Sequence, residues 1–174
     1  MVYCDFQFTV SCCGFYNTFV ESQLSPMESG NTPIQSIIVQ DFDYKDFNLL
    51  EKYKGKPLLI IIYNNQCLGC TGRAIPLAYE YQQEYPNLQV VGIHSIFNMK
   101  PVSEDDIKSI FTTKELPFPI YLDQNHQVYD QFESEGTPQW LLITSEGYLY
   151  RSIFGSQLGA QNRLMYALDA LCAV

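Results

Sequence analysis

Two cysteines separated by two residues, Cys67 and Cys70, are the side chains of this 174-residue chain whose types and spacing most directly suggest chemistry. They follow an apolar run over residues 58–63 and precede a helix-like stretch. A thiol at a strand-to-helix junction lies beside unpaired backbone amides and the positive end of the helix dipole, which stabilise a thiolate. The thiolate is the nucleophile, so we predict that Cys67 attacks a disulfide and that Cys70, one turn further and more buried, resolves the mixed disulfide.

A structural pair, or half of a zinc site, is the alternative interpretation of these two cysteines. Zinc usually takes four ligands, and a second pair with suitable spacing is missing, because Cys12 and Cys13 are adjacent and His94 and His126 are isolated. The strand-helix context therefore favours redox chemistry with no metal and no cofactor. The expected partners are protein or small-molecule disulfides and dithiols, with an electron donor that the sequence does not identify.

Composition excludes several other classes of function. A formal charge of −9 argues against nucleic acid, whose phosphates require a basic surface. No segment approaches the ~18 consecutive apolar residues that a membrane-spanning helix needs, so no membrane insertion is expected. The first residues show no basic region followed by an apolar block, which favours a cytoplasmic location. A periplasmic or membrane-attached location is the alternative if a signal has been removed.

The chain divides into an N-terminal arm, residues 1–33, and a main domain, residues 34–174. Within the arm, alternating apolar residues from 2 to 12 predict a half-buried strand, and residues 21–33 predict a loop rich in Ser, Gly, Asn and Pro. Cys4 and Cys12 share the apolar face and are interpreted as small core residues, whereas Cys13 points the other way and leaves an intermolecular bridge open. Cys172 is interpreted as a packing residue of the last helix.

In the main domain, apolar runs alternate with helix-like patterns, which predicts an α/β fold. Strand-helix-strand units impose parallel pairing with a right-handed crossover, so parallel strands come first and an antiparallel hairpin comes last. Ser103, followed by Asp106 three residues later, predicts a capped helix start. The expected strands cover residues 37–39, 58–63, 89–94, 118–122, 139–144 and 148–154, and the expected helices cover residues 70–84, 125–133 and the C-terminal segment.

Several short motifs, taken in order, resemble the TlpA/ResA-like branch of the thioredoxin superfamily, and most closely its YkuV type. The resemblance covers about residues 34 to 172. Each motif alone is weak evidence for the family, but the motifs together, in this order, are specific for it. They are Lys54-Gly55-Lys56-Pro57, Cys67-Leu68-Gly69-Cys70, Val90-Val91-Gly92-Ile93-His94, Ser103-Glu104-Asp105-Asp106, Pro119-Ile120-Tyr121-Leu122-Asp123, Gly136-Thr137-Pro138 and Glu146-Gly147.

This resemblance implies a thioredoxin-like fold: a central mixed sheet with flanking helices, a helical insertion over residues 103–115, and an N-terminal extension. It implies a thiol-disulfide oxidoreductase that uses Cys67 and Cys70. It also implies that Pro138 follows a cis peptide bond and packs against the cysteine pair. The backbone of Thr137 would then pair with an extended substrate segment, which is recognition by strand addition.

Three departures from the family pattern concern the surroundings of the cysteine pair. Gln66 stands where thioredoxins usually carry tryptophan, which alters the apolar lip that meets partner proteins. Ile61 replaces a buried aspartate and Arg73 stands where glutamate is frequent, so an obvious proton acceptor for Cys70 is missing. Pro76 follows Cys70 by six residues instead of five, which predicts a one-residue bulge in the helix before its proline.

The roles of three charged or titratable residues stay open at this point. Arg73 lowers the pKa of a thiol by its charge, or is a solvated helix residue. His94, at the carboxyl end of its strand, shuttles a proton, or is a structural, hydrogen-bonded histidine. His126 is interpreted as a surface residue at a helix start.

Two other functions compete with disulfide exchange. The first is a redox-silent thioredoxin-like module that binds a partner protein through the Pro138 groove and the N-terminal strand. The second is peroxide reduction, which is disfavoured because no threonine precedes Cys67 at the spacing that peroxidases of this superfamily use.

Overall fold

The structure is a computed structural model that describes residues 32–97 and 101–173 of the chain. Most of the predicted arm, including its expected strand and Cys4, Cys12 and Cys13, lies outside these residues. The part of the arm that is described, residues 32 and 33, forms a short edge strand, β1, that pairs with the strand β8 (Tyr148–Phe154). The sequence pattern did not predict this pairing, since it assigned those residues to a loop.

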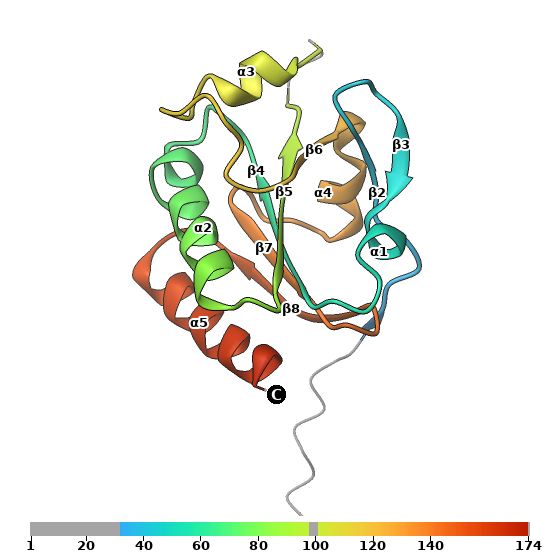
Figure 1. Ribbon diagram of the computed structural model, residues 1–174, viewed down its shortest axis with the longest axis vertical. Coiled ribbons are helices and arrows are strands. Elements are labelled where there is room, and N and C mark those ends of the chain that lie inside the picture. The colour runs from blue at the N-terminus through green and yellow to red at the C-terminus, as the bar shows by residue number, and fades with distance from the viewer. Residues whose placement is uncertain (1–31, 98–100, 174) are drawn as a thin grey trace, which may run out of the picture.

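An eight-stranded mixed sheet runs through the described part of the molecule, with the strand order β1-β8-β7-β4-β5-β6-β2-β3 (Figure 1). Only the central pairs β4–β5 and β5–β6 are parallel, and the remaining neighbours are antiparallel. The mixed α/β architecture predicted from the sequence is therefore confirmed. The strands are β1 (Thr32–Pro33), β2 (Ile38–Gln40), β3 (Asp46–Asn48), β4 (Leu58–Tyr63), β5 (Gln89–Ser95), β6 (Ile120–Asp123), β7 (Gln139–Ile143) and β8 (Tyr148–Phe154).

Strand β4 lies at the centre because every one of its side chains is apolar and buried. Successive residues of a strand point to opposite faces of the sheet, so β4 contributes to two separate cores. Leu59, Ile61 and Tyr63 join one apolar cluster. The alternate residues of the same strand join a second cluster on the opposite face. This burial on both faces fixes the position of the strand that leads to the cysteines.

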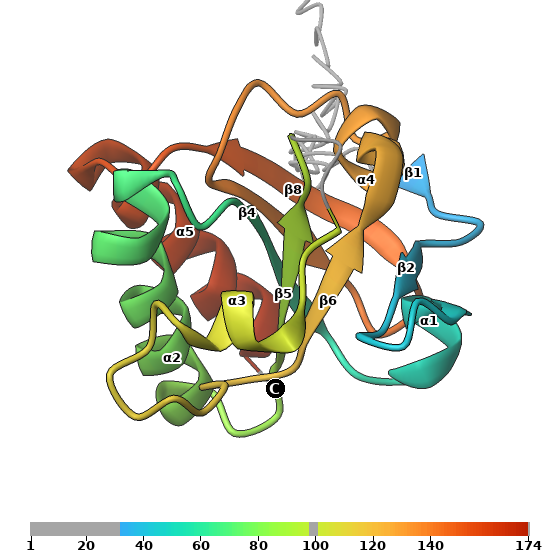
Figure 2. The same ribbon diagram turned by 90° about the horizontal axis from the view of Figure 1, so that it is seen from above.

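Helices cover both faces of the sheet (Figures 1 and 2). Helices α2 and α5 contribute buried residues to the cluster that contains Leu59, together with Ile107 of α3. Helices α1 and α4 contribute Leu49 and Val128 to the other cluster. The helical segments are α1 (Leu49–Lys52), the π-helix η1 (Cys70–Ala74), α2 (Ile75–Glu84), α3 (Glu104–Lys108), the 3-10 turn η2 (Gln124–His126), α4 (Gln127–Gln131) and α5 (Leu158–Cys172).

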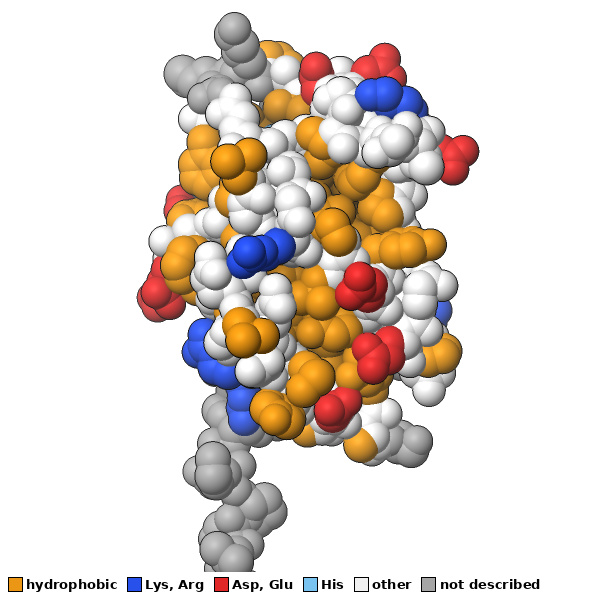
Figure 3. Space-filling model, turned by 90° about the vertical axis from the view of Figure 1, so that its left-hand side faces the viewer, with side chains coloured by type: hydrophobic (Ala, Val, Ile, Leu, Met, Phe, Trp, Pro, Cys, Tyr) orange, Lys and Arg blue, Asp and Glu red, His pale blue; other side chains and the backbone are white. Residues whose placement is uncertain are grey.

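The outer surface of the α2 and α5 layer carries a band of apolar side chains, which Figure 3 shows on the side of the molecule that these helices cover. Tyr79 of α2 and Tyr166 of α5 are among the large exposed apolar side chains. In the described ranges, no helix combines the length and the apolar character that crossing a bilayer requires.

The predicted insertion contains a shorter helix than expected. Ser103 caps α3 in a capping box with Asp106, as predicted. The helix then ends at Lys108 although residues to 115 were expected to continue the segment. Threonines at 112 and 113 are weak helix formers, and Lys114 adopts a left-handed backbone with φ of 58°, so the remainder consists of turns.

Three other elements differ from the prediction. The short strand β3 and the helix α1 were not predicted, because each is too short to show a periodic pattern. The helix expected over residues 125–133 begins later, at Gln127, because Asn125 and His126 have positive φ. The buried carboxylate of Asp123 accepts hydrogen bonds from the amides of Val128 and Tyr129 at 2.9 and 3.0 Å, which satisfies donors of the first turn.

Candidate active site

Cys67 lies in the turn between β4 and η1, at the carboxyl end of the central strand. Its amide donates a hydrogen bond to the carbonyl oxygen of Asn64 at 3.0 Å. Its own carbonyl oxygen accepts hydrogen bonds from the amides of Cys70 and Thr71, also at 3.0 Å. The first turn of the helix therefore closes over Cys67 and directs backbone N–H groups toward it.

The sulfur of Cys67 is half-buried and lies among hydrogen-bonding groups. It accepts a hydrogen bond from the amide of Cys70 at 3.3 Å, and its thiol donates to the carbonyl oxygen of Thr137 at 3.2 Å. Burial raises the pKa of Cys67. Hydrogen bonds with the Cys70 thiol, with the side chain of Thr137 and with the amides of Cys70 and Gly69 lower it by more, so the pKa of Cys67 lies below its usual value. The site therefore favours a thiolate at Cys67.

Cys70 lies behind Cys67 and is buried in the cluster under α2. Burial, followed by its hydrogen bond to Cys67, raises the pKa of Cys70 to about 12. The thiols of this pair are free and their acidities are shifted in opposite directions. This arrangement suits one attacking thiolate and one protonated thiol held in reserve.

Thr137 and Pro138 reach the cysteines from the segment that leads into β7. The Thr137–Pro138 peptide bond is cis, as the family resemblance implied. The carbonyl oxygen of Pro138 accepts a hydrogen bond from the amide of Gly155 at 2.9 Å, and the carbonyl oxygen of Gly155 accepts one from the Trp140 indole at 2.8 Å. These bonds hold the proline segment beside the thiols.

The turn after β8 is part of the site, and the sequence analysis did not identify it. A methyl group built on Gly69 would lie 2.9 Å from the hydroxyl oxygen of Ser156 and 3.9 Å from the sulfur of Cys67. Glycine at position 69 therefore allows the cysteine turn and the turn at Ser156 to approach closely. The available signal was Gly155, a turn residue with φ of 100° that directly follows a strand.

The bulge predicted from the position of Pro76 is confirmed. Cys70–Ala74 form a π-helix, and Pro76 lies in the first turn of α2, directly after this π-helix. Within the bulge, Arg73 is exposed and its guanidinium donates a hydrogen bond to Oε1 of Gln157 at 3.1 Å. Arg73 is not among the groups that lower the pKa of Cys67, so its solvated interpretation fits better.

His94 lies close to the cysteine turn but is buried, with 4% of its surface exposed. Its Nε2 accepts a hydrogen bond from the amide of Asn65 at 3.3 Å, and burial lowers the pKa of His94 to about 4. A neutral ring engaged in this way fits the structural interpretation rather than a proton shuttle.

Ile61, which replaces the buried aspartate of thioredoxins, lies in the same apolar cluster as Cys70.

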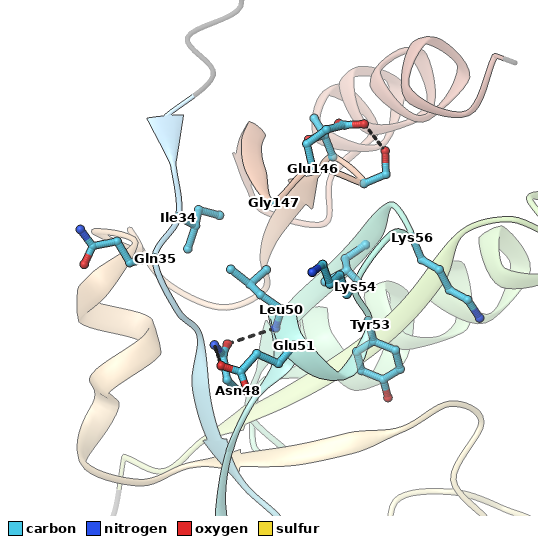
Figure 4. A pocket seen from close by; sticks show the side chains of 13 residues that line it. Ile34, Gln35, Asn48, Leu50, Glu51, Tyr53, Lys54, Lys56, Glu146 and Gly147 are labelled. Carbon is cyan, nitrogen blue, oxygen red and sulfur yellow. Dashed lines mark hydrogen bonds between the residues drawn. The ribbon is translucent and has the colours of Figure 1, made fainter.

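A cavity of about 350 Å³ lies at the opposite end of β4 and contains none of the predicted site residues (Figure 4). Leu58, the first residue of β4, lines it, so the length of the strand separates it from the cysteines by roughly 17 Å. In this cavity the carboxylate of Glu146 accepts a hydrogen bond from Ser145 at 2.6 Å.

No group of three metal-ligating side chains occurs within residues 32–97 and 101–173.

Comparisons with known proteins support the thioredoxin-like interpretation of the fold. The thiol-disulfide isomerase of Corynebacterium glutamicum superposes with a TM-score of 0.68 over 83% of this chain and 98% of that structure, at 22% identity. This likeness shows the fold, with the predicted central sheet and flanking helices.

Two sequence relatives extend the comparison. The thiol-disulfide oxidoreductase YkuV of Bacillus subtilis is 32% identical over 100 residues, which are 54% of this chain and 64% of that protein. The chain thus spans less than two thirds of the Bacillus protein. A Haemophilus influenzae protein named as the peroxiredoxin bcp is 27% identical over 126 residues, 71% of this chain and 76% of that protein. Residues 31–154 match the AhpC/TSA family, and the chain therefore belongs to this family of thioredoxin-like enzymes.

Proposed function

We propose that the chain is a thiol-disulfide oxidoreductase that exchanges a dithiol at Cys67 and Cys70 for a disulfide in a protein or small molecule. One observation carries this proposal. The half-buried sulfur of Cys67, whose pKa is lowered, accepts a hydrogen bond from the amide of Cys70, the residue that would resolve the mixed disulfide. The family and the similarity to YkuV support the same class of reaction.

In the proposed reaction, the Cys67 thiolate attacks one sulfur of the substrate disulfide. A bond forms between Cys67 and that sulfur while the substrate S–S bond breaks, and the second substrate sulfur leaves as a thiolate that takes up a proton. Cys70 then loses its proton and attacks the Cys67 sulfur, forming the Cys67–Cys70 bridge and releasing the other substrate thiol. The substrate disulfide gains two electrons, which an external dithiol must return to the enzyme.

The second step requires the pKa of Cys70 to fall from about 12. Burial is the largest cause of the raised value, and the hydrogen bond and charge interaction with Cys67 add to it. The latter two contributions disappear once Cys67 is held in a mixed disulfide. The amide of Asn64 and Thr137 continue to favour the thiolate, so Cys70 becomes more acidic at the stage where it must react.

We assign substrate binding to Thr137 and Pro138. An extended segment of the substrate would lie beside Pro138 and pair with the backbone of Thr137, as a strand added to a sheet does. The Thr137 carbonyl oxygen already lies 3.2 Å from the attacking sulfur. Leu68, between the two cysteines, is 88% exposed. This leucine offers a protein substrate the apolar contact that the residue before Cys67, Gln66, does not provide.

Reduction of insulin disulfides by the full chain, with dithiothreitol as electron donor, tests the proposal. The wild-type chain should accelerate insulin reduction, and Cys67→Ser should reduce the rate to that of dithiothreitol alone. Cys172→Ser should retain the wild-type rate because this free thiol lies in α5. In a separate reaction without dithiothreitol, pre-reduced Cys70→Ser should accumulate a mixed disulfide with insulin through Cys67, because no second thiol resolves it. Equal rates in the wild-type and Cys67→Ser chains would instead favour the redox-silent binding module.

Peroxide reduction is a second candidate, favoured by the match to AhpC/TSA proteins and by the similarity to bcp. An assay with hydrogen peroxide and the same electron donor separates it from disulfide exchange. The disulfide proposal expects insulin reduction to depend on both Cys67 and Cys70, whereas peroxide consumption that survives Cys70→Ser would identify a one-cysteine peroxidase.

The compartment decides the direction of electron flow. The cytoplasmic location expected from the sequence remains a prediction, and it would make the chain a reductant, because the glutathione and thioredoxin pools keep thiols reduced there. The absence of nucleic-acid partners also remains a prediction from the charge of −9.

A further inference from the structure

The position of the Cys67 sulfur depends on a turn that lies outside the strands of the sheet. Strand β4 ends at Tyr63 and the π-helix begins at Cys70, so residues 64–66 carry Cys67 outside both elements. Within this turn, the side-chain oxygen of Asn64 accepts a hydrogen bond from the amide of Gln66 at 2.8 Å. That bond closes an Asx-turn, which shapes the turn but does not attach it to the rest of the fold.

Attachment comes from the end of the neighbouring strand β5. The side-chain amide of Asn64 donates a hydrogen bond to the carbonyl oxygen of Ser95 at 2.9 Å. One residue further, the backbone amide of Asn65 donates to Nε2 of His94 at 3.3 Å. These bonds tie two successive residues of the turn to two successive residues of β5.

The insertion adds a third attachment from outside the sheet. The side-chain amide of Asn65 donates a hydrogen bond to the carbonyl oxygen of Asp106 in α3 at 3.0 Å. A surface pocket of about 160 Å³, lined by the turn, His94 and Asp106, lies between these elements. On this side, the hydrogen bonds to Ser95, His94 and Asp106 attach the turn to the fold.

His94 is suited to accept a backbone hydrogen bond because its ring is fixed and neutral. The imidazole stands edge-on to the ring of Tyr63, with centroids 5.3 Å apart and an interplanar angle of 80°. Burial holds the pKa of His94 near 4, so the ring is uncharged at neutral pH. Because Nε2 accepts from Asn65, the proton of the neutral ring is assigned to Nδ1, a buried atom with no hydrogen-bond partner among the described residues.

We propose that His94 and Asn64 are positioning residues for Cys67: they hold the turn against β5 so that the sulfur meets the amide of Cys70. This inference rests on the proposed function and adds residues that act on the thiol only through the backbone. Without these bonds, the donors that stabilise the thiolate lose their alignment with the sulfur, and a weaker alignment means a less acidic thiol.

The test measures the pH dependence of iodoacetamide alkylation at Cys67, located by peptide mass spectrometry, in the full chain. His94→Leu keeps an apolar volume without an acceptor, whereas His94→Gln places an amide oxygen where it can accept from Asn65. Asn64→Ala removes both side-chain bonds of Asn64, and Asn64→Ser keeps a hydroxyl that can accept from Gln66. Thermal unfolding of each variant, followed by circular dichroism, establishes that it is folded.

We expect His94→Leu and Asn64→Ala to raise the pKa of Cys67 by about one unit and to slow alkylation at neutral pH up to about tenfold. His94→Gln should stay near the wild-type value, and Asn64→Ser should lie between. Folded His94→Leu and Asn64→Ala proteins that titrate Cys67 as the wild type does would overturn the inference. If His94→Leu does not fold, the pKa of Cys67 in Asn64→Ala tests the inference alone. If neither His94→Leu nor Asn64→Ala folds, Asn64→Ser tests it: a raised pKa of Cys67 supports the inference and an unchanged pKa overturns it.

The two proposals fail in different ways in this experiment. A wild-type pKa at or above that of an ordinary cysteine would contradict the activated thiol of the proposed function. A lowered wild-type pKa that the variants leave unchanged would contradict only the positioning role.

Discussion

The amide nitrogen of Cys70 lies 3.3 Å from the sulfur of Cys67 and donates a hydrogen bond to it. The residue that would resolve a mixed disulfide therefore also stabilises the thiolate that forms it. The pKa of Cys67 is lowered, while burial raises the pKa of Cys70 to about 12. The two sulfurs therefore differ in exposure and in acidity, which supports the proposed order of attack, with Cys67 first.

Gly69→Ala should place a methyl group 2.9 Å from the Ser156 hydroxyl oxygen and force that side chain to move. We expect a loss of about 1 kcal/mol in the free energy of unfolding, at the low end for overpacking because a hydroxyl can rotate away. Chemical denaturation followed by the fluorescence of Trp140, the one tryptophan of the chain, measures the change.

Ser156→Ala in the Gly69→Ala background should recover most of that stability, since the obstructing oxygen is gone. Gly72→Ala is the matched control in the same helical segment, because nothing lies within 4 Å of the methyl group that it adds. A Gly69→Ala protein as stable as Gly72→Ala would show that the two turns do not approach as described.

Trp140→Phe should remove the indole donor that bonds the Gly155 carbonyl oxygen at 2.8 Å. Trp140 is 1% exposed, so an unpaired carbonyl and a small cavity would remain, at a cost of about 1 to 4 kcal/mol. Insulin reduction should also slow, because the amide of Gly155 holds the Pro138 carbonyl oxygen. Unchanged stability and activity, by circular dichroism and the insulin assay, would contradict this role for the turn.

His94 should make the stability of the fold depend on pH in a defined window. Its pKa is lowered from 6.5 to about 4 by burial, so between these values the unfolded chain binds a proton that the folded chain does not. The free energy of unfolding should therefore fall by roughly 3 kcal/mol as pH decreases from 6.5 to about 4, and the His94 contribution should be constant below that.

Denaturation of the wild type and of His94→Gln across this range isolates the contribution of His94, because the carboxylates are common to both chains. The difference in unfolding free energy between the two proteins should shrink or reverse toward acid. A difference independent of pH would mean that His94 is not buried in its neutral form.

Long or strongly patterned features were predictable from the sequence. The continuous apolar residues of β4 and β5 predicted the central strands because burial on both faces leaves no polar alternation. The spacing from Cys70 to Pro76, one residue longer than in the family that the chain resembles, predicted a bulge, and the π-helix accommodates this extra residue. The cis bond at Pro138 came from family resemblance, since the residues alone did not favour it.

Features that depend on contacts between distant segments were not predictable. Strand β3 and helix α1 are too short for a periodic sequence pattern to reveal them. Pairing with β2 stabilises β3, and packing against the core stabilises α1. The approach of Ser156 to Gly69 joins positions 87 residues apart. The acceptor role of His94 likewise depends on where the Asn65 amide lies, which the residue types do not encode.

Titration of the thiolate ultraviolet absorbance in the reduced protein measures the acidity of Cys67. The difference between the wild-type and Cys67→Ser chains cancels the absorbance of the tyrosines and reports Cys67. We predict a pKa below the ordinary cysteine value of about 8.5. Cys67 titrating at or above that ordinary value would contradict it.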